Sequence, residues 1–159
     1  MSTKLWYNQY KEGWLSALPL GNGKIAAMFF GNPQTEHIQV NEESLYTGKQ
    51  LEETYNTSPE MLDKIRQMIF DGDYEGACAL SDVQFLAEPP RVRFYQTIGD
   101  LYVDFHRKGE VCDYHKELEL STGVAKASYV RDGIGYESES FISQKYNALA
   151  YRIRTASGE

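Results

Sequence analysis

The first third of the chain alternates short apolar runs with turn-forming residues. The longest apolar run predicts a buried strand over residues 24–30, and residues 38–40 predict a second, shorter strand. Residues 18–23 read Leu-Pro-Leu-Gly-Asn-Gly, which predicts a turn, because Gly and Asn tolerate positive φ and Pro fixes the entry. This part of the chain is therefore expected to consist of strands joined by tight turns.

Apolar residues in the middle third recur at helical spacing. Ser58 and Pro59 suit the N-cap and the first position of a helix. The residues that follow form one apolar stripe: Met61, Leu62, Ile65, Met68 and Ile69. The segment 71–73 ends this helix, and a second helix is expected over residues 74–85. Together they predict a two-helix insertion at roughly residues 59–86.

The last third shows the period of two that is typical of half-buried strands. Leu101, Val103 and Phe105 alternate with polar positions, and residues 117–120, 124–131, 134–142 and 149–153 predict further strands. Asp132-Gly133 is the strongest hairpin signal, since a type I′ turn needs positive φ at both central positions. The order indicates a mainly β fold, an antiparallel sandwich with a helical insertion. We expect residues 1–159 to form a single domain that is truncated at its C-terminus.

Composition narrows the functional class. The 159 residues carry a net charge of −7, with 42% hydrophobic and 25% charged residues. This balance is typical of a globular protein and excludes a disordered tail or a collagen-like repeat. The acidic charge argues against nucleic-acid partners, and the 12 tyrosines suit an uncharged polar partner such as a sugar.

The N-terminal sequence and the two cysteines give little information about the cellular compartment. We see no signal peptide and no apolar run long enough for a membrane span, so no membrane partner is expected. The cytoplasm is the default expectation, although a removed leader would leave no trace. Cys78, expected in a helix, and Cys112, expected in a loop, are too few for a disulfide scaffold, and a bridge between them is neither inferred nor excluded.

The sequence offers few candidates for a phosphate, metal or catalytic site. Gly21-Asn22-Gly23-Lys24 lacks the glycine spacing and the following Ser or Thr of a phosphate loop. Two Asp-x-His pairs at 104/106 and 113/115 share a strand spacing that suits a metal site, but solvated polar positions explain them better. Glycoside hydrolysis needs two facing carboxyl groups, and no pair stands out among 42/43, 71/73 and 137/139. No nucleophile is recognisable either, so we expect no catalytic residue, no metal and no cofactor.

Several motifs, in the right order, resemble the N-terminal domain of glycoside hydrolase family 95, the α-L-fucosidases and related α-L-galactosidases. Residues 14–23 are similar to W-x-x-A-L-P-L-G-N-G, residues 38–48 to I-Q-L-N-E-x-x-L-W-x-G, and residues 95–101 to Y-Q-P-L-G-D-L. Residues 113–120 resemble the D-Y-R-R-E-L-D-L strand. This sequence departs from the family pattern at Ala26, Tyr46, His115, Lys116 and Ser138, so substrate specificity is not carried over.

The resemblance implies a β-supersandwich that packs against a catalytic (α/α)6 barrel, which is absent from this sequence. No catalytic residue of the family has a counterpart here, so this chain alone is expected to be inactive and to scaffold the barrel. Its loops are expected to rim the sugar site through Asn22, Asn41, Glu42 and Tyr46. An oligosaccharide substrate and a homo-oligomer are the other expected partners.

A stand-alone carbohydrate-binding module is the alternative hypothesis. Such a module needs exposed aromatic faces beside amide hydrogen-bonding groups. The candidates lie near the N-terminus: Trp6, Tyr7, Asn8, Gln9, Tyr10 and Trp14. Of these, Trp14 is expected to lie in the core instead, where its replacement would unfold the domain.

Overall fold

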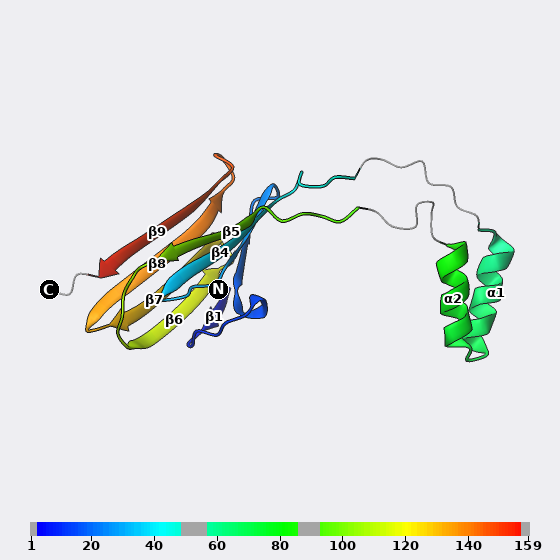
Figure 1. The fold of residues 1–159 in the computed structure, drawn as a ribbon, viewed down its shortest axis with the longest axis horizontal. Helices are drawn as coiled ribbons and strands as arrows, with labels where there is room; N and C mark the ends of the chain where they lie inside the picture. The colour runs from blue at the N-terminus through cyan, green and yellow to red at the C-terminus, as the bar shows by residue number, and fades with distance from the viewer. Residues whose placement is uncertain (1–2, 49–56, 86–92, 157–159) are drawn as a thin grey trace. The chain divides into compact units, whose positions relative to one another are not determined.

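The computed structural model describes residues 3–48, 57–85 and 93–156, and it divides the chain into two compact units. The first unit comprises the described residues of Met1–Leu45 and Gln96–Glu159, and the second those of Tyr46–Tyr95. The first unit is built of two antiparallel sheets (Figure 1). The mainly β fold predicted from the sequence is therefore confirmed.

The larger sheet has five strands in the order β1-β6-β7-β8-β9. Its strands are β1 Lys4–Tyr7, β6 Val111–Glu119, β7 Val124–Arg131, β8 Ile134–Ser143 and β9 Ala148–Ala156. The smaller sheet has the order β2-β3-β4-β5, with β2 Leu18–Gly21, β3 Ile25–Phe29, β4 Thr35–Glu42 and β5 Gly99–Asp104. A short 3-10 helix, η1 Trp14–Ser16, precedes β2.

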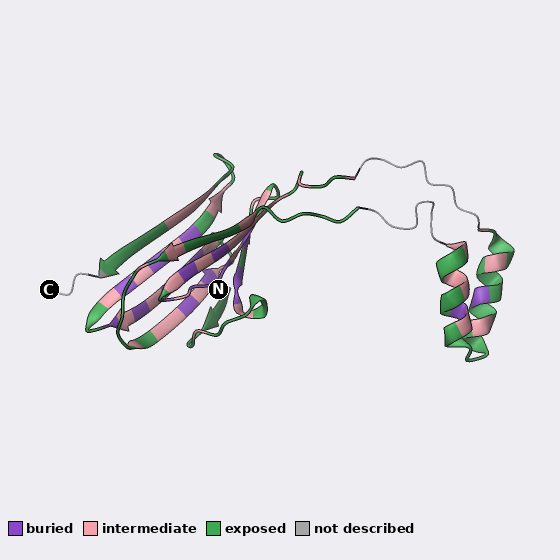
Figure 2. Cartoon of the chain, in the orientation of Figure 1, coloured by how far each residue is buried: buried purple, intermediate pink, exposed green. Residues whose placement is uncertain are grey.

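The core lies between the two sheets, and buried residues alternate with less buried ones along β7 and much of β8 (Figure 2). On β7 every second residue is buried, which places the small side chains of Ala125 and Ala127 in the interior. These side chains leave room for the larger ones of β2 to β4. The buried cluster comprises Leu18, Leu20, Ala27, Phe29, Ile38, Leu118, Ala125 and Ala127.

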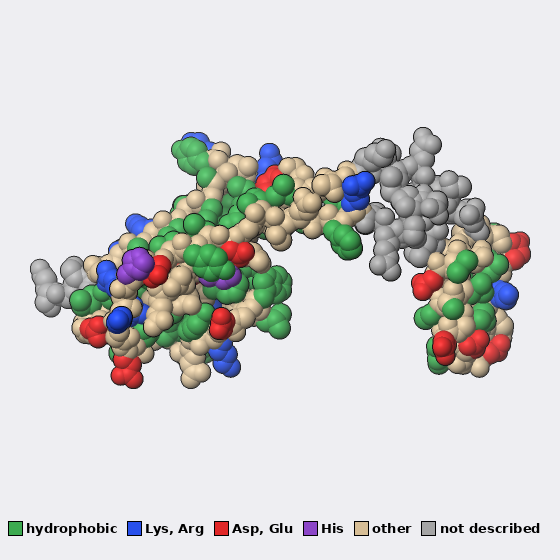
Figure 3. Space-filling model, viewed as in Figure 1, with side chains coloured by type: hydrophobic (Ala, Val, Ile, Leu, Met, Phe, Trp, Pro, Cys, Tyr) green, Lys and Arg blue, Asp and Glu red, His purple; other side chains and the backbone are tan. Residues whose placement is uncertain are grey.

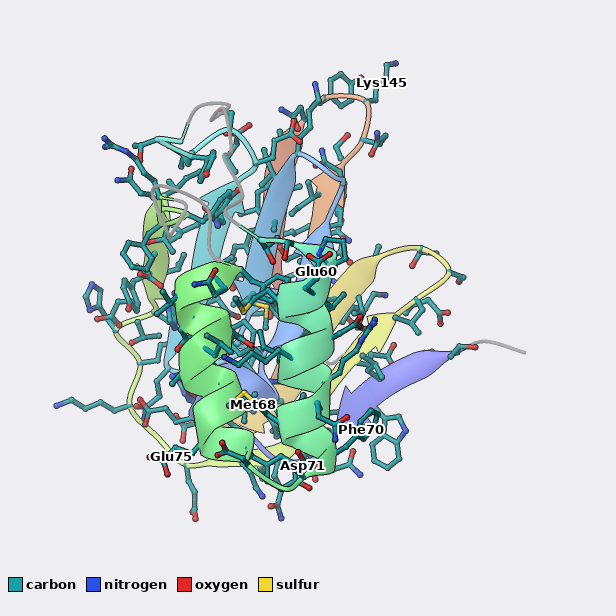
Figure 4. The ribbon with its side chains drawn as sticks, turned by 90° about the vertical axis from the view of Figure 1, so that its right-hand side faces the viewer. Glu60, Met68, Phe70, Asp71, Glu75 and Lys145 are labelled. Atoms are coloured by element: carbon teal, nitrogen blue, oxygen red, sulfur yellow. The ribbon has the colours of Figure 1, made fainter. Side chains whose placement is uncertain are left out.

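The second unit contains helices α1 Pro59–Phe70 and α2 Tyr74–Gln84, as the periodicity predicts. The Ser58 hydroxyl caps α1 by accepting from the Met61 amide, and Asp73 caps α2 by accepting from the Gly76 amide. Figure 4 places Asp71 and Glu75 at the end of the pair where the chain turns. Ile65 and Ala77 are the buried residues of the two helices. Neither described helix has the length and apolar character that crossing a membrane requires.

The structure corrects the elements predicted for the first third of the chain. Residues 18–21 form a strand rather than part of a turn, because Leu18 and Leu20 point into the core while Pro19 lies on the edge strand of its sheet, where a missing N–H is tolerated. The turn is confined to the residues between Gly21 and Ile25. The short strand predicted at 38–40 extends over Thr35–Glu42.

Two further elements differ from the sequence prediction. Strand β1 lies in the polar N-terminal stretch, and its four exposed residues carry no burial signal because pairing with β6 alone defines the strand. Cys112 lies in β6 rather than in a loop, and both cysteines are free and exposed. The Asp132-Gly133 hairpin is confirmed, with φ values of 50° and 78°. Leu86, the last residue of the predicted insertion, lies outside the described residues.

Candidate functional site

The carboxylate pairs considered for catalysis have structural partners. Glu137 and Glu139 on β8 form ion pairs with Arg154 and Arg152 on the neighbouring β9. Asp73 caps α2, and Asp71 accepts a hydrogen bond from Gln67. The Glu42 carboxylate accepts from both the amide and the hydroxyl of Ser44. These contacts give each of the pairs at least one carboxylate that stabilises local structure.

The two Asp-x-His pairs do not share strand faces as expected. His106 lies beyond the end of β5 with φ 50°, and its backbone amide donates to Asp104. Asp113 has φ 51° at an irregularity in the β6–β7 register, so it is not in phase with His115. Within the described ranges, no group of three or more His, Cys, Asp or Glu side chains is placed to hold a metal ion.

The structure gathers three of the four residues expected near the sugar at one end of the smaller sheet. Asn22 lies in the β2–β3 turn, while Asn41 and Glu42 end β4 and pair with Ala26 and Ile25 of β3. Tyr46 belongs to the second unit, where it pairs with Tyr95.

Asn22 has an extensive set of local contacts. Its side-chain oxygen accepts from the amides of Lys24 and Ile25, and its nitrogen donates to Ser143 and Asn147 of the β8–β9 hairpin. The Asn41 oxygen accepts from the Glu42 amide. Asn41 also lines a hollow on the outer face of the sheet.

That outer face carries a candidate site that combines aromatic and polar side chains, which we call the Trp14 groove. It consists of two hollows of about 320 and 420 Å³ that share Trp14 and Gln39. The first is bordered by Pro19, Met28, Asn41 and Thr97, and the second by Tyr10, Glu12, Asn32, His37 and Tyr102. Both volumes fall in the range of small-ligand cavities, roughly 300–1,000 Å³.

Trp14 stands between the two hollows and is exposed to solvent. The exposed fraction of Trp14 is 57%, and its indole nitrogen donates to Gln39 Oε1 at 3.1 Å. The bond fixes the ring because β4 holds Gln39 on the outward face of the sheet. The expectation that Trp14 belongs to the core is therefore wrong. Figure 3 shows that hydrophobic side chains also lie open to solvent among charged ones on the visible face of this unit.

A stack of three rings forms the floor of the second hollow. The His37 ring lies 4.0 Å from the ring centroid of Phe30 and 4.6 Å from that of Tyr102, nearly parallel to both. Its Nε2 is 2.6 Å from Asp100 Oδ1 on β5. The stack presents the exposed face of Tyr102 beside a carboxylate, an imidazole and an amide. Such a surface offers both an apolar platform and hydrogen-bonding groups.

Sequence reasoning named Trp14 and Asn41 but missed His37, Asp100 and Tyr102. Their proximity depends on β4 pairing with β5, in which His37 is opposite Tyr102 and Gln39 is opposite Asp100. The two strands are separated in sequence by the whole helical insertion. The polar residues at alternate positions 37, 39 and 41 were the sequence signal that one face of this strand points outward.

Two buried charges lie under this face. Glu36, 1% exposed, accepts hydrogen bonds from the amides of Gly31, Asn32 and His37. Lys116, also 1% exposed, reaches across from β6 and donates to the carbonyls of Ser16 and Phe30 at 2.7 and 2.8 Å. The ammonium of Lys116 thus joins the larger sheet to the element that carries Trp14 and to Phe30, the buried ring of the stack.

Burial shifts the pKa of both groups toward their neutral forms. Desolvation raises the pKa of Glu36 to about 7, against the lowering effect of its three backbone donors and of Lys116. Desolvation lowers the pKa of Lys116 to about 8, and the nearby Glu36 carboxylate opposes that shift. Both groups therefore titrate near neutral pH although water does not reach them.

Comparison with known proteins gives the family. The model of the glycosyl hydrolase family 65 N-terminal domain matches residues 5–159. α-L-Fucosidase 2 of Arabidopsis thaliana is 31% identical over 153 residues, which cover 94% of this chain and 18% of that protein. Probable α-fucosidase A of Aspergillus niger is 29% identical and that of Aspergillus oryzae 23% identical, with 89% and 87% of this chain covered.

The chain spans about a fifth of the length of these relatives, which are covered to 18–20%. The names of these relatives confirm the resemblance to α-fucosidases. The match over nearly the whole chain, with the two-sheet fold, leads to one conclusion: this chain belongs to the glycosyl hydrolase family 65 N-terminal domain family.

Proposed function

We propose that this chain is a non-catalytic domain of an α-fucosidase-like glycoside hydrolase, which scaffolds a catalytic (α/α)6 barrel and forms one wall of the sugar site through the Trp14 groove. The observation that carries the proposal is the composition of that groove, in which exposed aromatic faces adjoin amide and carboxylate groups. The glycosidase chemistry needs a facing pair of carboxyl groups, which on this proposal belongs to the barrel.

The groove suits a sugar for a simple physical reason. The face of an aromatic ring is electron-rich, so the polarised C–H bonds on one side of a pyranose ring pack favourably against it. The hydroxyl groups then need planar partners at the rim of the ring. Gln39 retains its amide N–H₂ group after accepting from Trp14, and Asp100 retains one oxygen beside the one that His37 contacts. Asn41, Glu42, Asn22 and Tyr46 remain proposed sugar contacts.

Replacement of Trp14 tests the sugar role. We expect Trp14→Ala to lower affinity for a fucosylated oligosaccharide by tenfold or more, since truncating an aromatic anchor costs about 2 kcal/mol or more and about 1.4 kcal/mol corresponds to tenfold. Ligand-observed NMR on the 159-residue chain measures the effect. Trp6→Ala is the matched control, because Trp6 is 58% exposed but lies on β1 of the other sheet.

The outcomes of that experiment separate the possibilities. Equal loss of affinity in both variants would contradict the groove assignment, because Trp6 lies outside the groove. Release of free fucose by the unmodified chain would contradict the non-catalytic role, and the carboxylates on β4 and β8 would then need examination as catalysts. Line broadening of the sugar signals without turnover supports the proposal.

The scaffold role and the stand-alone module predict different behaviour in solution. A scaffold separated from its barrel leaves apolar surface uncovered, and Leu15 on η1 is 89% exposed beside Trp14. We therefore expect concentration-dependent self-association in light scattering, reduced by Leu15→Asp. A monomer at all concentrations, combined with tight sugar binding, would favour the stand-alone carbohydrate-binding module instead.

A further inference from the structure

We propose that the Trp14 groove continues into a second, amide-lined hollow, and that the combined surface binds an oligosaccharide chain rather than a single sugar. This inference rests on the proposed sugar role of the groove. The second hollow, which we call the amide hollow, has a volume of about 620 Å³. It lies between the loop after β1 and the start of β6.

The two sites adjoin. Tyr10 and Asn32 line both the amide hollow and the Trp14 groove, so the two hollows meet at these residues. The Asn32 side chain donates to the Tyr10 hydroxyl at 3.0 Å and accepts from the Gln34 amide at 2.9 Å. Tyr10 also packs edge-on against Tyr114 at 6.2 Å. The junction is therefore held in place from both sides.

The lining of the amide hollow indicates the class of ligand. Four amide side chains, Asn8, Gln9, Asn32 and Gln34, surround it with two phenols, and Asp113 is the one charged side chain in the described lining. A lining without cations does not suit phosphate or nucleic acid. Neutral amides both donate and accept, which matches the dense hydroxyl groups of a saccharide.

Several of these polar groups have hydrogen-bond donors or acceptors that no described residue uses. The Tyr10 oxygen accepts from Asn32, and within the described part of the chain nothing accepts the phenolic hydrogen of Tyr10. The side chains of Gln9 and Gln34 are exposed and make no hydrogen bond with any described residue. Replacing these two glutamines therefore removes ligand contacts without removing contacts that stabilise the sandwich.

The experiment compares sugars of increasing length on the intact 159-residue chain. Methyl α-L-fucopyranoside, 2′-fucosyllactose and lacto-N-fucopentaose are titrated by ligand-observed NMR. We expect Kd to fall by tenfold or more from the monosaccharide to the pentasaccharide, since each additional hydrogen-bonded subsite contributes. The double variant Gln9→Ala/Gln34→Ala is expected to weaken pentasaccharide binding about threefold to tenfold and to leave methyl fucoside binding unchanged.

Failure of this inference is distinguishable from failure of the proposed function. Equal affinity for all three sugars, or a double variant that binds the pentasaccharide normally, would overturn the extended site, while a Trp14-dependent affinity would keep the sugar role. Absence of binding by every sugar would remove both.

Discussion

Replacement of Gly31 by alanine is expected to lower the free energy of unfolding by about 2–5 kcal/mol, the sum of backbone strain and overpacking. Gly31 has a φ of 68°, and a Cβ atom there would lie 2.7 Å from Lys116 Cδ and 2.9 Å from the Tyr114 hydroxyl. Neither neighbour moves freely. Lys116 is held by two carbonyls, and Tyr114 donates to the Gly31 carbonyl itself.

A second glycine separates the two contributions to this loss. Gly123 has a φ of 66° but open space where a Cβ would be placed. Gly123→Ala should therefore cost only the backbone strain, about 1–2 kcal/mol. Urea unfolding followed by tryptophan fluorescence reports on the sandwich, because both tryptophans lie in that unit. Equal losses in the two variants would show that contact with Lys116 and Tyr114 contributes nothing.

The sandwich is expected to have a minimum of stability between about pH 7 and 8, because of its two buried charges. Glu36 has a pKa of about 7 when folded against an ordinary 4.5, so the folded state holds its proton more tightly. Stability from this group is complete below pH 4.5 and falls as the pH rises to 7. The neighbouring phenol of Tyr114 has a pKa raised by burial and stays neutral throughout this range.

Lys116 has the opposite effect on the pH dependence of stability, at higher pH. Its pKa is about 8 when folded against an ordinary 10.5, so the folded state releases its proton first. Stability therefore rises from about pH 8 to 10.5. Each of these two changes in stability should amount to about 3–4 kcal/mol, since each pKa differs by about 2.5 from its ordinary value and one pKa unit corresponds to about 1.4 kcal/mol.

Urea unfolding of single-substitution variants at a series of pH values shows which group causes the fall in stability and which causes the rise. Glu36→Gln should remove the decline on the acidic side, and Lys116→Met should remove the rise on the alkaline side. Lys116→Met also leaves the carbonyls of Ser16 and Phe30 without this donor, so its stability should be lower at every pH. A decline that persists unchanged in Glu36→Gln would contradict the assignment to that carboxyl.

The parts of the fold that could be predicted are those marked by residues close together in the sequence. The α1 cap at Ser58, the hairpin at Asp132-Gly133 and the alternation on β7 each depend on residues close together in sequence. Where burial did not mark a strand, as in β1, the sequence carried no comparable signal. The edge position of Pro19 was likewise invisible without knowing which strands are neighbours.

The candidate site was less predictable, for a physical reason. The ring stack brings His37 of β4 against Tyr102 of β5, and the pairing of these strands is a long-range contact. The buried pair of Glu36 and Lys116 joins different sheets in the same way. Polar residues in sequence give no indication that they face the interior until the register of both strands is known.

The chain leaves the first unit after Leu45 and returns to it at Gln96. The Gln96 amide donates to the Leu45 carbonyl at 3.0 Å, so the residues that flank the whole of Tyr46–Tyr95 are joined within the sandwich. The entropy of closing a loop grows only slowly with its length, so segments of very different size fit between such joined ends at similar cost. The segment between Leu45 and Gln96 is therefore expected to accept insertions and deletions at little entropic cost, while the strands of the sandwich keep their register.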